Sequence, residues 1–554
     1  MFRRILAVFF VTGTFVPGWD TSSALAQCEQ PKLIAGEVSG GDYFGRHIAV
    51  HDDRALIGAY GDDHAGSQSG AAYIFHREGE AWIQDAKLTA GDTVGGDQFG
   101  YTVSIWNDYA LVGAVADQTG GLMCGSAYVF VNSNGTWVQQ AKLLAADLGH
   151  GDLFGVYVAI EDHHAVVGAD SDDTPLYDAG SAYVYVRDDN GTPSNPTDDT
   201  WTQQAKLTAS DAEETNLFGR SVGISGDYIV VGVYNDNDYG TASGSAYIFR
   251  RDDNGTPEDH SDDAWVEQAK LHADDAWATA QFGVGVAICG DYVVIGAHHH
   301  DGVGTDSGAA YLFRRDDNGT PANPDDDTWA QQAKLTPADT QANDWFGRFV
   351  SISGDDVLVG AYGDDDAGDQ SGSAYFFRRD DNGTPEDPSD DTWPEQVKLT
   401  ASDGAAGDWF GYSVATDGGY ALVGAKWDDD AGVDAGSVYV YDVLGGYDCD
   451  SNGINDACEV DCNTNGILDV CDIAGSTSED CDANGVPDEC ESIGVGFDGD
   501  GDIDFSDFSR FQACFTGPGP TALGAGCCLY DFEPDDDVDL DDFAVLHAAL
   551  SGPL

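Results

Sequence analysis

Residues 408–425 read DWFGYSVATDGGYALVGA, in which a Phe-Gly pair stands fourteen residues before a Gly-Ala pair. The Phe-Gly pair recurs at intervals of 55 or 64 residues, with its Phe at Phe44, Phe99, Phe154, Phe218, Phe282, Phe346 and Phe410. A second column, Gly-Ala in every copy except one Gly-Val, keeps the same intervals at Gly58, Gly113, Gly168, Gly232, Gly296, Gly360 and Gly424. Because self-similarity at fixed intervals is the signature of a repeat architecture, the sequence predicts seven copies of one unit.

Each copy is expected to hold four short strands. In the last copy, the segments 412–415, 420–425 and 437–441 are rich in Tyr, Val, Ser and Ala, and a Gly-containing turn separates the first two. In the other copies a further segment begins at a Trp and runs through Lys-Leu, as in 201–208. Short segments of this composition, bounded by Gly and Asp, predict an all-β fold. Four strands in each of seven units predict a seven-bladed β-propeller.

The ends of the repeat array predict how the ring closes. Lys32-Leu33 precedes the first unit, whereas the last unit lacks its own Trp…Lys-Leu strand. We therefore expect the N-terminal strand to pair with 437–441, which would remove an exposed sheet edge. This closure would bring Cys28 close to Cys449, and we expect Cys28 to form a disulfide within or near the C-terminal cysteine cluster.

Two residues of the motif have expected roles in packing. The Phe of each Phe-Gly pair is expected to act as a wedge between adjacent blades. The Gly beside it is expected to supply a turn conformation that is closed to other residues.

The N-terminus predicts export. Arg3 and Arg4 precede an apolar run over 5–16, and Ala24-Leu25-Ala26 fits a signal-peptide cleavage site. The run is too short to span a bilayer, and no other stretch is expected to cross a membrane. The sequence therefore predicts a signal peptide over 1–26 and a secreted or cell-surface protein.

The charge balance excludes one class of partner. With 99 acidic and 23 basic residues, the formal net charge is −76. Nucleic-acid binding needs basic patches, so nucleic acid is not expected as a partner. The self-repulsion could be relieved by bound divalent cations, by a saline environment or by both.

Residues 446–492 contain three twelve-residue phrases, DCDSNGINDACE, DCNTNGILDVCD and DCDANGVPDECE. Each places oxygen-bearing side chains at positions one, three, five, nine and twelve and Gly at position six, which is the spacing of a calcium loop. The predicted Ca²⁺ ligands are Asp448, Asp450, Asn452, Asp456, Glu459, Asp461, Asn463, Asn465, Asp469, Asp472, Asp480, Asp482, Asn484, Asp488 and Glu491.

Residues 493–554 contain two further acidic loops, each followed by a helix-like segment. We expect calcium here too. The predicted ligands are Asp498, Asp500, Asp502, Asp504 and Asp507 in the first loop and Asp531, Glu533, Asp535, Asp537, Asp539 and Asp542 in the second.

The phrases FGYSVA, YALVGA and GSAYVF, together with the Lys-Leu strand, resemble the FG-GAP repeats of secreted bacterial proteins and, more distantly, the propeller of integrin α chains. This resemblance covers about 30–443, and implies extracellular binding or adhesion without specifying a ligand. Integrin propellers hold calcium in a long hairpin between the first two strands; here that turn is short, so those sites are not carried over.

The C-terminal segments resemble two other families. The Cys-rich phrases are similar to thrombospondin type 3 repeats, and the paired loop-helix segments are similar to a type I dockerin, which implies a cohesin-like partner. Gly496 and Asp536 depart from the dockerin loop pattern. The expected domains are a propeller over 27–445, calcium-binding repeats over 446–492 and a small helical dockerin-like domain over 493–554.

Two sets of propeller carboxylates have alternative interpretations. One column, between the second and third strands, is Asp62, Asp117, Asp172, Asp236, His300, Asp364 and Asp428. Its members close Asx turns or form a ring that binds cations or polar ligands. The acidic loops over 186–201, 250–265, 314–329 and 378–393 are hairpin turns with solvated flanks or calcium clips. His298–His300 is expected to lie in a solvated loop, with metal binding as the alternative.

No catalytic motif stands out among the 99 acidic residues, so the sequence does not favour an enzyme. The favoured function is calcium-dependent adhesion or binding of an extracellular glycan or protein, with the dockerin-like domain as an anchor. The alternatives are a polysaccharide-degrading hydrolase or lyase in an extracellular complex and a structural surface protein of a halophile.

Overall fold

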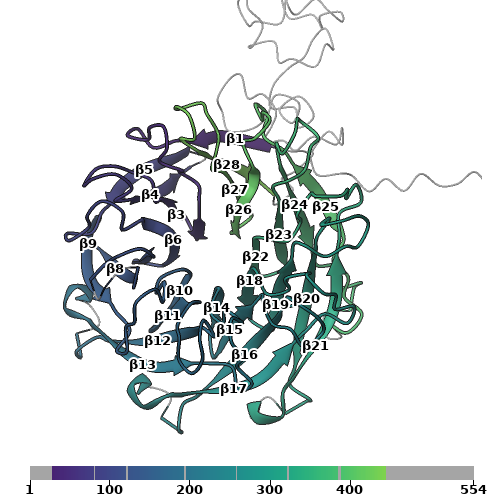
Figure 1. Ribbon diagram of the computed structural model, residues 1–554, viewed down its shortest axis with the longest axis horizontal. Coiled ribbons are helices and arrows are strands. Elements are labelled where there is room, and N and C mark those ends of the chain that lie inside the picture. The colour runs from purple at the N-terminus through teal and green to yellow at the C-terminus, as the bar shows by residue number, and fades with distance from the viewer. Residues whose placement is uncertain are drawn as a thin grey trace, which may run out of the picture.

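Each sequence repeat forms one four-stranded antiparallel sheet, and seven such sheets stand as blades around a central channel (Figure 1). The computed structural model describes residues 28–443 except 80, 120, 122, 193–194, 257–258, 321–322 and 385–387. The predicted all-β, seven-bladed propeller is therefore confirmed for these residues. The stalk and the dockerin-like domain expected after it lie outside the described residues.

The strands are described from the channel outward, for blades 1 to 7 in turn. The innermost strands are β2 (Ile48–His51), β6 (Phe99–Trp106), β10 (Val158–Glu161), β14 (Ser221–Ser225), β18 (Val286–Cys289), β22 (Val350–Ser353) and β26 (Phe410–Asp417). The second strands are β3 (Arg54–Ala59), β7 (Tyr109–Ala114), β11 (His164–Ala169), β15 (Tyr228–Val233), β19 (Tyr292–Ala297), β23 (Asp356–Ala361) and β27 (Tyr420–Ala425).

The two outer layers follow the same order. The third strands are β4 (Ala71–Glu78), β8 (Ser126–Ser133), β12 (Ser181–Asp188), β16 (Ser245–Asp252), β20 (Ala309–Asp316), β24 (Ser373–Arg378) and β28 (Ser437–Asp442). The outermost strands are β5 (Ala81–Leu88), β9 (Thr136–Leu143), β13 (Thr200–Leu207), β17 (Ala264–Leu271), β21 (Thr328–Leu335), β25 (Glu395–Leu399) and β1 (Cys28–Leu33). Three short 3₁₀ helices precede outermost strands: η1 (Pro196–Asp198), η2 (His260–Asp262) and η3 (Pro324–Asp326).

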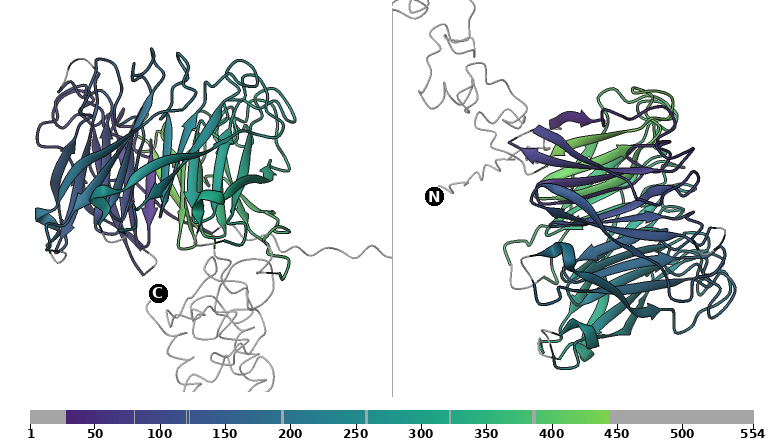
Figure 2. Two further views of the ribbon diagram at one scale, coloured as in Figure 1. Left: turned by 90° about the horizontal axis from the view of Figure 1, so that it is seen from below. Right: turned by 90° about the vertical axis from the view of Figure 1, so that its left-hand side faces the viewer.

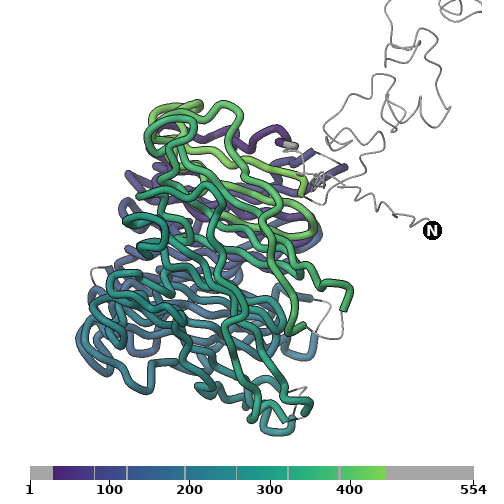
Figure 3. The backbone as a smooth tube through the Cα atoms, turned by 90° about the vertical axis from the view of Figure 1, so that its right-hand side faces the viewer, coloured from purple at the N-terminus to yellow at the C-terminus, as the bar shows by residue number. Residues whose placement is uncertain are grey.

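The first strand of the chain completes the last blade, as the sequence predicts. β1 pairs antiparallel with β28, with Cys28 opposite Asp442 and Leu33 opposite Val438. Figure 3 shows the N-terminal strand beside the last strands of the chain. Leu33 is buried in a core shared with blades 7 and 1, so the closing strand contributes to the core as well as to the sheet. The disulfide predicted for Cys28 concerns side chains outside the described residues.

The Phe-Gly and Gly-Ala columns interlock at each blade interface. Each Phe of the column is at most 2% exposed and packs in a core formed by two blades; Phe44, for example, contacts residues of blades 7 and 1. Each Gly after it has a φ between 82° and 95°, where only glycine fits without strain. The two predicted roles are thus confirmed.

The second Gly column is required by space. A Cβ placed on Gly58 would lie 2.1 Å from the carbonyl oxygen of Gly100 in the next blade. The equivalent Cβ on Gly424 in blade 7 would lie 2.4 Å from the carbonyl oxygen of Gly45 in blade 1. Backbones of neighbouring blades therefore touch at this point around the whole ring.

The two faces of the ring differ in their loops (Figure 2). One face, called the loop face below, carries the connections from the second to the third strands and from one blade to the next. The opposite face carries two-residue turns between first and second strands, such as Gly418–Gly419. It also holds both described ends of the chain, because Cys28 pairs with Asp442 there.

Candidate binding site at the mouth of the central channel

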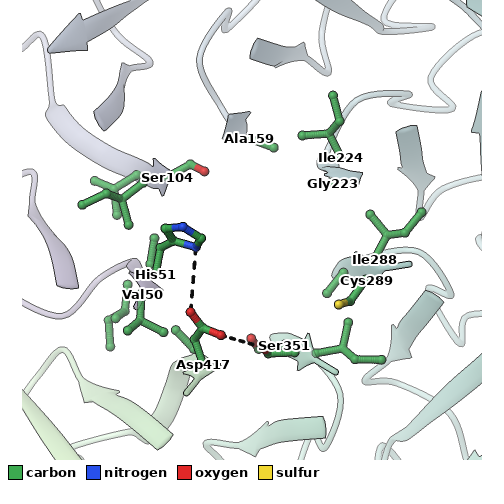
Figure 4. Close-up of a pocket in the computed structure, with 18 of the residues that line it drawn as sticks. Val50, His51, Ser104, Ala159, Gly223, Ile224, Ile288, Cys289, Ser351 and Asp417 are labelled. Atoms are coloured by element: carbon green, nitrogen blue, oxygen red, sulfur yellow. Dashed lines mark hydrogen bonds and ion pairs between the residues drawn. The ribbon is translucent and has the colours of Figure 1, made fainter. Parts of the chain in front are cut away.

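The channel contains a cavity of about 380 Å³ that reaches the two-residue turns at His51, Trp106 and Asp417. Figure 4 shows residues that line it. Small residues such as Ser104, Ala159 and Gly223 line its middle. Polar residues at its rim serve the fold: Asp417 Oδ2 accepts a hydrogen bond from the Asp52 amide at 2.7 Å, and Glu161 Oε1 accepts one from the Gly226 amide at 3.0 Å. Each of these carboxylates already binds a turn of the next blade, so we do not place the binding site here.

Three aromatic side chains lie at the loop-face end of this cavity. The ring of His47 lies 4.9 Å from that of Tyr157 and 5.9 Å from that of Phe349, centroid to centroid. Burial and the neighbouring Arg46 lower the pKa of His47 to about 3, so it is neutral at physiological pH. Tyr157 and Phe349 line both this cavity and a smaller one of about 20 Å³ nearer the loop face, so they lie between the two.

Four basic side chains gather at the loop-face mouth of the channel, and we call Arg46, Arg220, Arg348 and Lys426 the cation cluster. The three arginines each follow a Phe-Gly pair at the inner edge of blades 4, 6 and 1, and Lys426 directly follows β27. All three arginines line one cavity of about 20 Å³, beside Tyr157 and Phe349. Because repeat positions superpose around the ring, residues distant in sequence converge on one point.

The cation cluster has few counter-charges. Arg220 Nη1 lies 3.4 Å from Asp170 Oδ2. Within the described part of the chain, no carboxylate lies within ion-pair distance of Arg46, Arg348 or Lys426. Arg348 Nε is buried and has no hydrogen-bond partner. This is unusual, because buried charges in proteins are normally paired.

Aromatic faces and one phenol take the place of carboxylates. The guanidinium of Arg46 lies 4.3 Å from the Tyr101 ring centroid, and Lys426 Nζ lies 3.8 Å from that of Tyr412. Burial raises the pKa of Tyr412, yet the nearby Arg46, Arg348 and Lys426 outweigh it and lower that pKa to about 6. Burial lowers the pKa of Lys426 to about 8, against the opposing effect of Tyr412. The cluster is thus electropositive enough to favour an anionic phenol.

An arc of aromatic side chains flanks the cation cluster on the loop face over blades 6, 7 and 1. Successive ring centroids lie 5.0 Å apart for Trp345 and Tyr362, 5.0 Å for Tyr362 and Trp409, and 3.9 Å for Trp409 and Trp427. Tyr43 and Tyr60 stack at 5.0 Å in blade 1. Trp345, Trp409, Trp427, Tyr43 and Tyr60 are partly exposed. We call this set, with Tyr362, the aromatic arc.

The Asp residues that recur between the second and third strands close turns, as one of their two interpretations predicts. Asp117 Oδ1 accepts a hydrogen bond from the Thr119 amide at 2.7 Å, and Lys142 Nζ lies 2.7 Å from Asp117 Oδ2. The same amide bond forms at every other Asp of the column, and in each case a lysine of the Lys-Leu column lies 2.7–3.4 Å away. The column is therefore neutralised by protein cations.

The acidic loops of blades 3 to 6 also use their carboxylates internally. In the first, Asp188 and Asp189 accept hydrogen bonds from the amides of Asn190 and Gly191. A buried Asp next to the outermost strand joins two blades, as Asp327 Oδ2 does by accepting from Tyr228 at 2.9 Å and Arg315 at 2.8 Å. The sequence interpretation missed this second, buried role.

Two groups of side chains have ligand atoms close enough together to hold a metal. The first is His164, His260 and Asp263, and the second is Asp339, Asp364 and Asp366. Arg251 Nη1 lies 2.7 Å from His260 Nδ1 and 3.0 Å from Asp263 Oδ2, so a guanidinium already occupies the first group. Lys398 occupies the second in the same way, at 2.8 Å from Asp339 and 2.9 Å from Asp364.

The His298–His300 run departs from its expectation. His298 is 2% and His300 is 7% exposed, so the prediction of a solvated loop is wrong for both. His300 takes the place of the column Asp and lies 3.4 Å from Lys334 Nζ. Burial is the main reason why the pKa of His298 lies well below its usual value.

The predicted calcium ligands from Asp448 to Asp542 all lie outside the described residues. The sequence interpretation also missed the cation cluster, although a signal was present. Phe-Gly is followed by Arg in three of the seven copies, in a chain that has few basic residues. No helix among the described residues is long and apolar enough to cross a membrane.

Comparison with known proteins identifies the repeat. The FG-GAP repeat matches seven times, at residues 28–75, 82–130, 137–185, 201–249, 265–313, 329–377 and 393–441. No curated protein matches the chain. Among solved structures, a chain from the crystal structure of a mitotic checkpoint complex is 11% identical with a TM-score of 0.41, over 79% of this chain and 98% of that one.

Proposed function

Because the chain belongs to the FG-GAP repeat family, we propose that it is an extracellular binding protein whose propeller holds a glycan at the loop-face mouth of its channel. An FG-GAP propeller fits a ligand-binding or adhesion role. The aromatic arc is the observation that carries the choice of a glycan. Its rings offer flat apolar faces with polar edges, which suit the C–H faces and hydroxyl groups of sugars.

The position of the arc supports this proposal. Trp345 and Trp409 each precede a Phe-Gly pair, and their backbone is held at φ values of 53° and 57°. The amide of Trp409 donates to the Gln370 carbonyl oxygen at 3.3 Å, which fixes the Trp on the loop face. Both described chain ends lie on the opposite face, so attachment through the C-terminal region would leave the mouth accessible.

The remaining parts of the proposal rest on the sequence alone. Residues 1–26 would direct export, the loops of 446–492 and 493–554 would bind calcium, and the dockerin-like segment would dock to a cohesin-like partner. In this arrangement the propeller binds the glycan while the C-terminal segments attach the protein to an extracellular assembly or surface.

The test is glycan-array screening of the full chain, followed by titration of each hit with tryptophan fluorescence as the readout. We expect Trp409→Ala and Trp345→Ala each to weaken binding about fivefold, since loss of one aromatic contact is worth about 1 kcal/mol. Trp277→Ala is the matched control, because Trp277 is 56% exposed and lies outside the arc.

Two outcomes would contradict this function. If the hits bind the Trp409→Ala and Trp345→Ala variants as tightly as the unmodified protein, the mouth is not the glycan site. If the protein binds no glycan but shortens polysaccharides, seen as new reducing ends, the degrading-enzyme alternative gains support instead.

A further inference from the structure

We propose that the cation cluster is the subsite for an anionic group, so that the ligand is an acidic glycan whose carboxylate or sulfate places an oxygen between Arg46, Arg220 and Arg348. This inference rests on the proposed function, because it names the chemistry of the ligand at the same mouth. It does not follow from glycan binding itself, since aromatic side chains bind neutral sugars equally well.

The mouth of the channel has more cations than counter-charges. The chain has 99 acidic residues against 23 basic ones, yet four bases gather at the mouth around only two acidic groups, the carboxylate of Asp170 and the phenol of Tyr412. Elsewhere in the described propeller, the lysines of the Lys-Leu column each lie beside at least one carboxylate, and Lys334, which faces His300 instead of a column Asp, pairs with Asp275. Holding guanidinium groups in a largely buried position with fewer counter-ions than cations is costly. An anion from the ligand would supply the missing charge.

The three arginines surround a small cavity that suits an oxygen of an anionic group. The three arginines come from blades 1, 4 and 6 and line one cavity of about 20 Å³ whose lining includes no acidic residue. That volume holds about one water-sized group, so a single oxygen of the carboxylate or sulfate would occupy it. Guanidinium groups present planar sets of N–H donors that match carboxylate and sulfate oxygens. Arg348 Nε is buried with its N–H unused, and is available to such an acceptor.

The aromatic side chains below the cluster indicate how a ligand would reach it. His47, Tyr157 and Phe349 lie between the cluster and the larger channel cavity, so we expect the anionic group to enter from the loop face. The aromatic arc stands at that entrance and would hold the sugar ring that carries the group. A terminal or protruding acidic substituent therefore fits better than the middle of a flat polyanionic chain.

The net charge argues against a polyanion held by long-range attraction. A chain of charge −76 repels polyanions at a distance. At physiological ionic strength this repulsion is screened beyond about 8 Å, whereas contacts within a buried cluster are screened much less. The site would therefore recognise one inserted acidic group at contact.

The experiment compares three probes on the full chain by calorimetry at physiological ionic strength: a neutral galactan oligosaccharide, the same oligosaccharide ending in a single galacturonate, and the same oligosaccharide carrying a single sulfate. We expect at least one acidic probe to bind tenfold or more tightly than the neutral one. Arg348→Gln should remove that advantage and leave neutral-sugar binding unchanged. Arg54→Gln is the matched control, because Arg54 is partly exposed and pairs with Asp108 at 3.3 Å.

A second measurement does not depend on the choice of sugar. We expect low-millimolar sulfate to raise the melting temperature of the full chain more than that of Arg348→Gln, with chloride at equal ionic strength as the reference. We also expect Arg348→Gln without ligand to melt at the same or a higher temperature than the unmodified protein, because it removes an uncompensated charge.

The outcomes separate the inference from the proposed function. If acidic and neutral probes bind equally and sulfate has no specific effect, the inference is wrong while glycan binding stands. If Arg348→Gln melts lower and keeps full affinity for acidic probes, the cluster is structural and the inference is also wrong. If sulfate binds specifically and arrays detect no glycan, the anion subsite stands and the proposed function fails.

Discussion

Two glycines from adjacent blades meet at each blade interface, and they explain the motif that defines the repeat. The Gly of Phe-Gly needs its positive φ, whereas Gly58 and its equivalents need the absence of a Cβ because a carbonyl of the next blade lies against them. The Phe between these glycines fills the core that the two blades share. At the residue scale, the repeated motif reflects one interblade contact that forms at all seven interfaces.

Gly58→Ala should therefore destabilise the propeller strongly. The added methyl would sit 2.1 Å from the Gly100 carbonyl oxygen, which forces the backbones of two blades apart. Overpacking of this kind costs about 3 kcal/mol of unfolding free energy. Gly36→Ala is the control, since a Cβ there meets nothing within 4 Å. Equal denaturation midpoints for the two variants would contradict this account.

Lys142→Met should destabilise the propeller, because it leaves the carboxylate of Asp117 without its cation. Burial raises the pKa of Asp117, but Lys142, Thr119 and Ser126 together lower it to about 2. Losing the lysine leaves a carboxylate 4% exposed without its cation, at a cost of about 2 kcal/mol in unfolding free energy. Arg54→Met, at an exposed pair, should cost under about 1 kcal/mol.

The dependence of the unfolding free energy on acid pH gives a second test of this ion pair. Since the pKa of Asp117 is depressed, its stabilising effect is present above its usual pKa and disappears as pH falls through about 2. The difference in unfolding free energy between the unmodified protein and Lys142→Met should therefore shrink below about pH 4. A constant difference from pH 7 to pH 2 would show that the pair does not act through this charge.

At the scale of elements, the ring depends on one strand that comes from the other end of the chain. β1 pairs with β28 and places Leu33 in the core of blades 7 and 1. Pro31 lacks a backbone N–H and sits in a strand with an irregular register, which an outermost strand tolerates. Because β1 is the outermost strand of blade 7, it completes the ring while its own outer edge stays open to solvent.

A chain that begins at Ala35 should therefore associate with itself. Without β1, the hydrogen-bonding edge of β28 is open, and open edges recruit other strands. We expect dimers or larger species by light scattering, and reversal on addition of a peptide of residues 28–35. A monomeric, fully stable truncated chain would show that β1 is dispensable for closure.

The element scale also separates two kinds of acidic segment. Loops that look like calcium clips in the sequence, such as 186–201, fold around their own amides and an arginine of the blade. Their composition matches that of a cation site because Asp serves both purposes. Only the backbone amides that point at each carboxylate distinguish the two, and a sequence does not display them.

At the scale of the whole molecule, charge is divided between a propeller that neutralises part of its own acids and a C-terminal segment that has almost no bases. Residues 448–554 hold 26 acids and one arginine, Arg510. The lysines of the Lys-Leu column, in contrast, lie beside carboxylates around the ring. Calcium should therefore act on the C-terminal segment far more than on the blades.

Limited proteolysis of the full chain tests this division. With calcium we expect the chain to resist cleavage, and with a chelator we expect cuts within 444–554 that release an intact propeller fragment, identified by mass. Sodium at equal ionic strength is the control, since a purely ionic effect would protect equally well. Chelator-dependent cuts inside the blades would instead point to calcium sites in the propeller.

The sequence by itself determined the blade number, the closing strand, the interblade Phe and the need for glycine beside it. It could do so because each of these depends on a contact repeated at a constant interval. Only the tertiary structure decided that the Asp column is paired with lysine, that His298 and His300 are buried, and that Arg46, Arg220 and Arg348 share one cavity. These depend on side-chain direction and on which copies face each other across the ring, and neither is encoded in the period of a repeat.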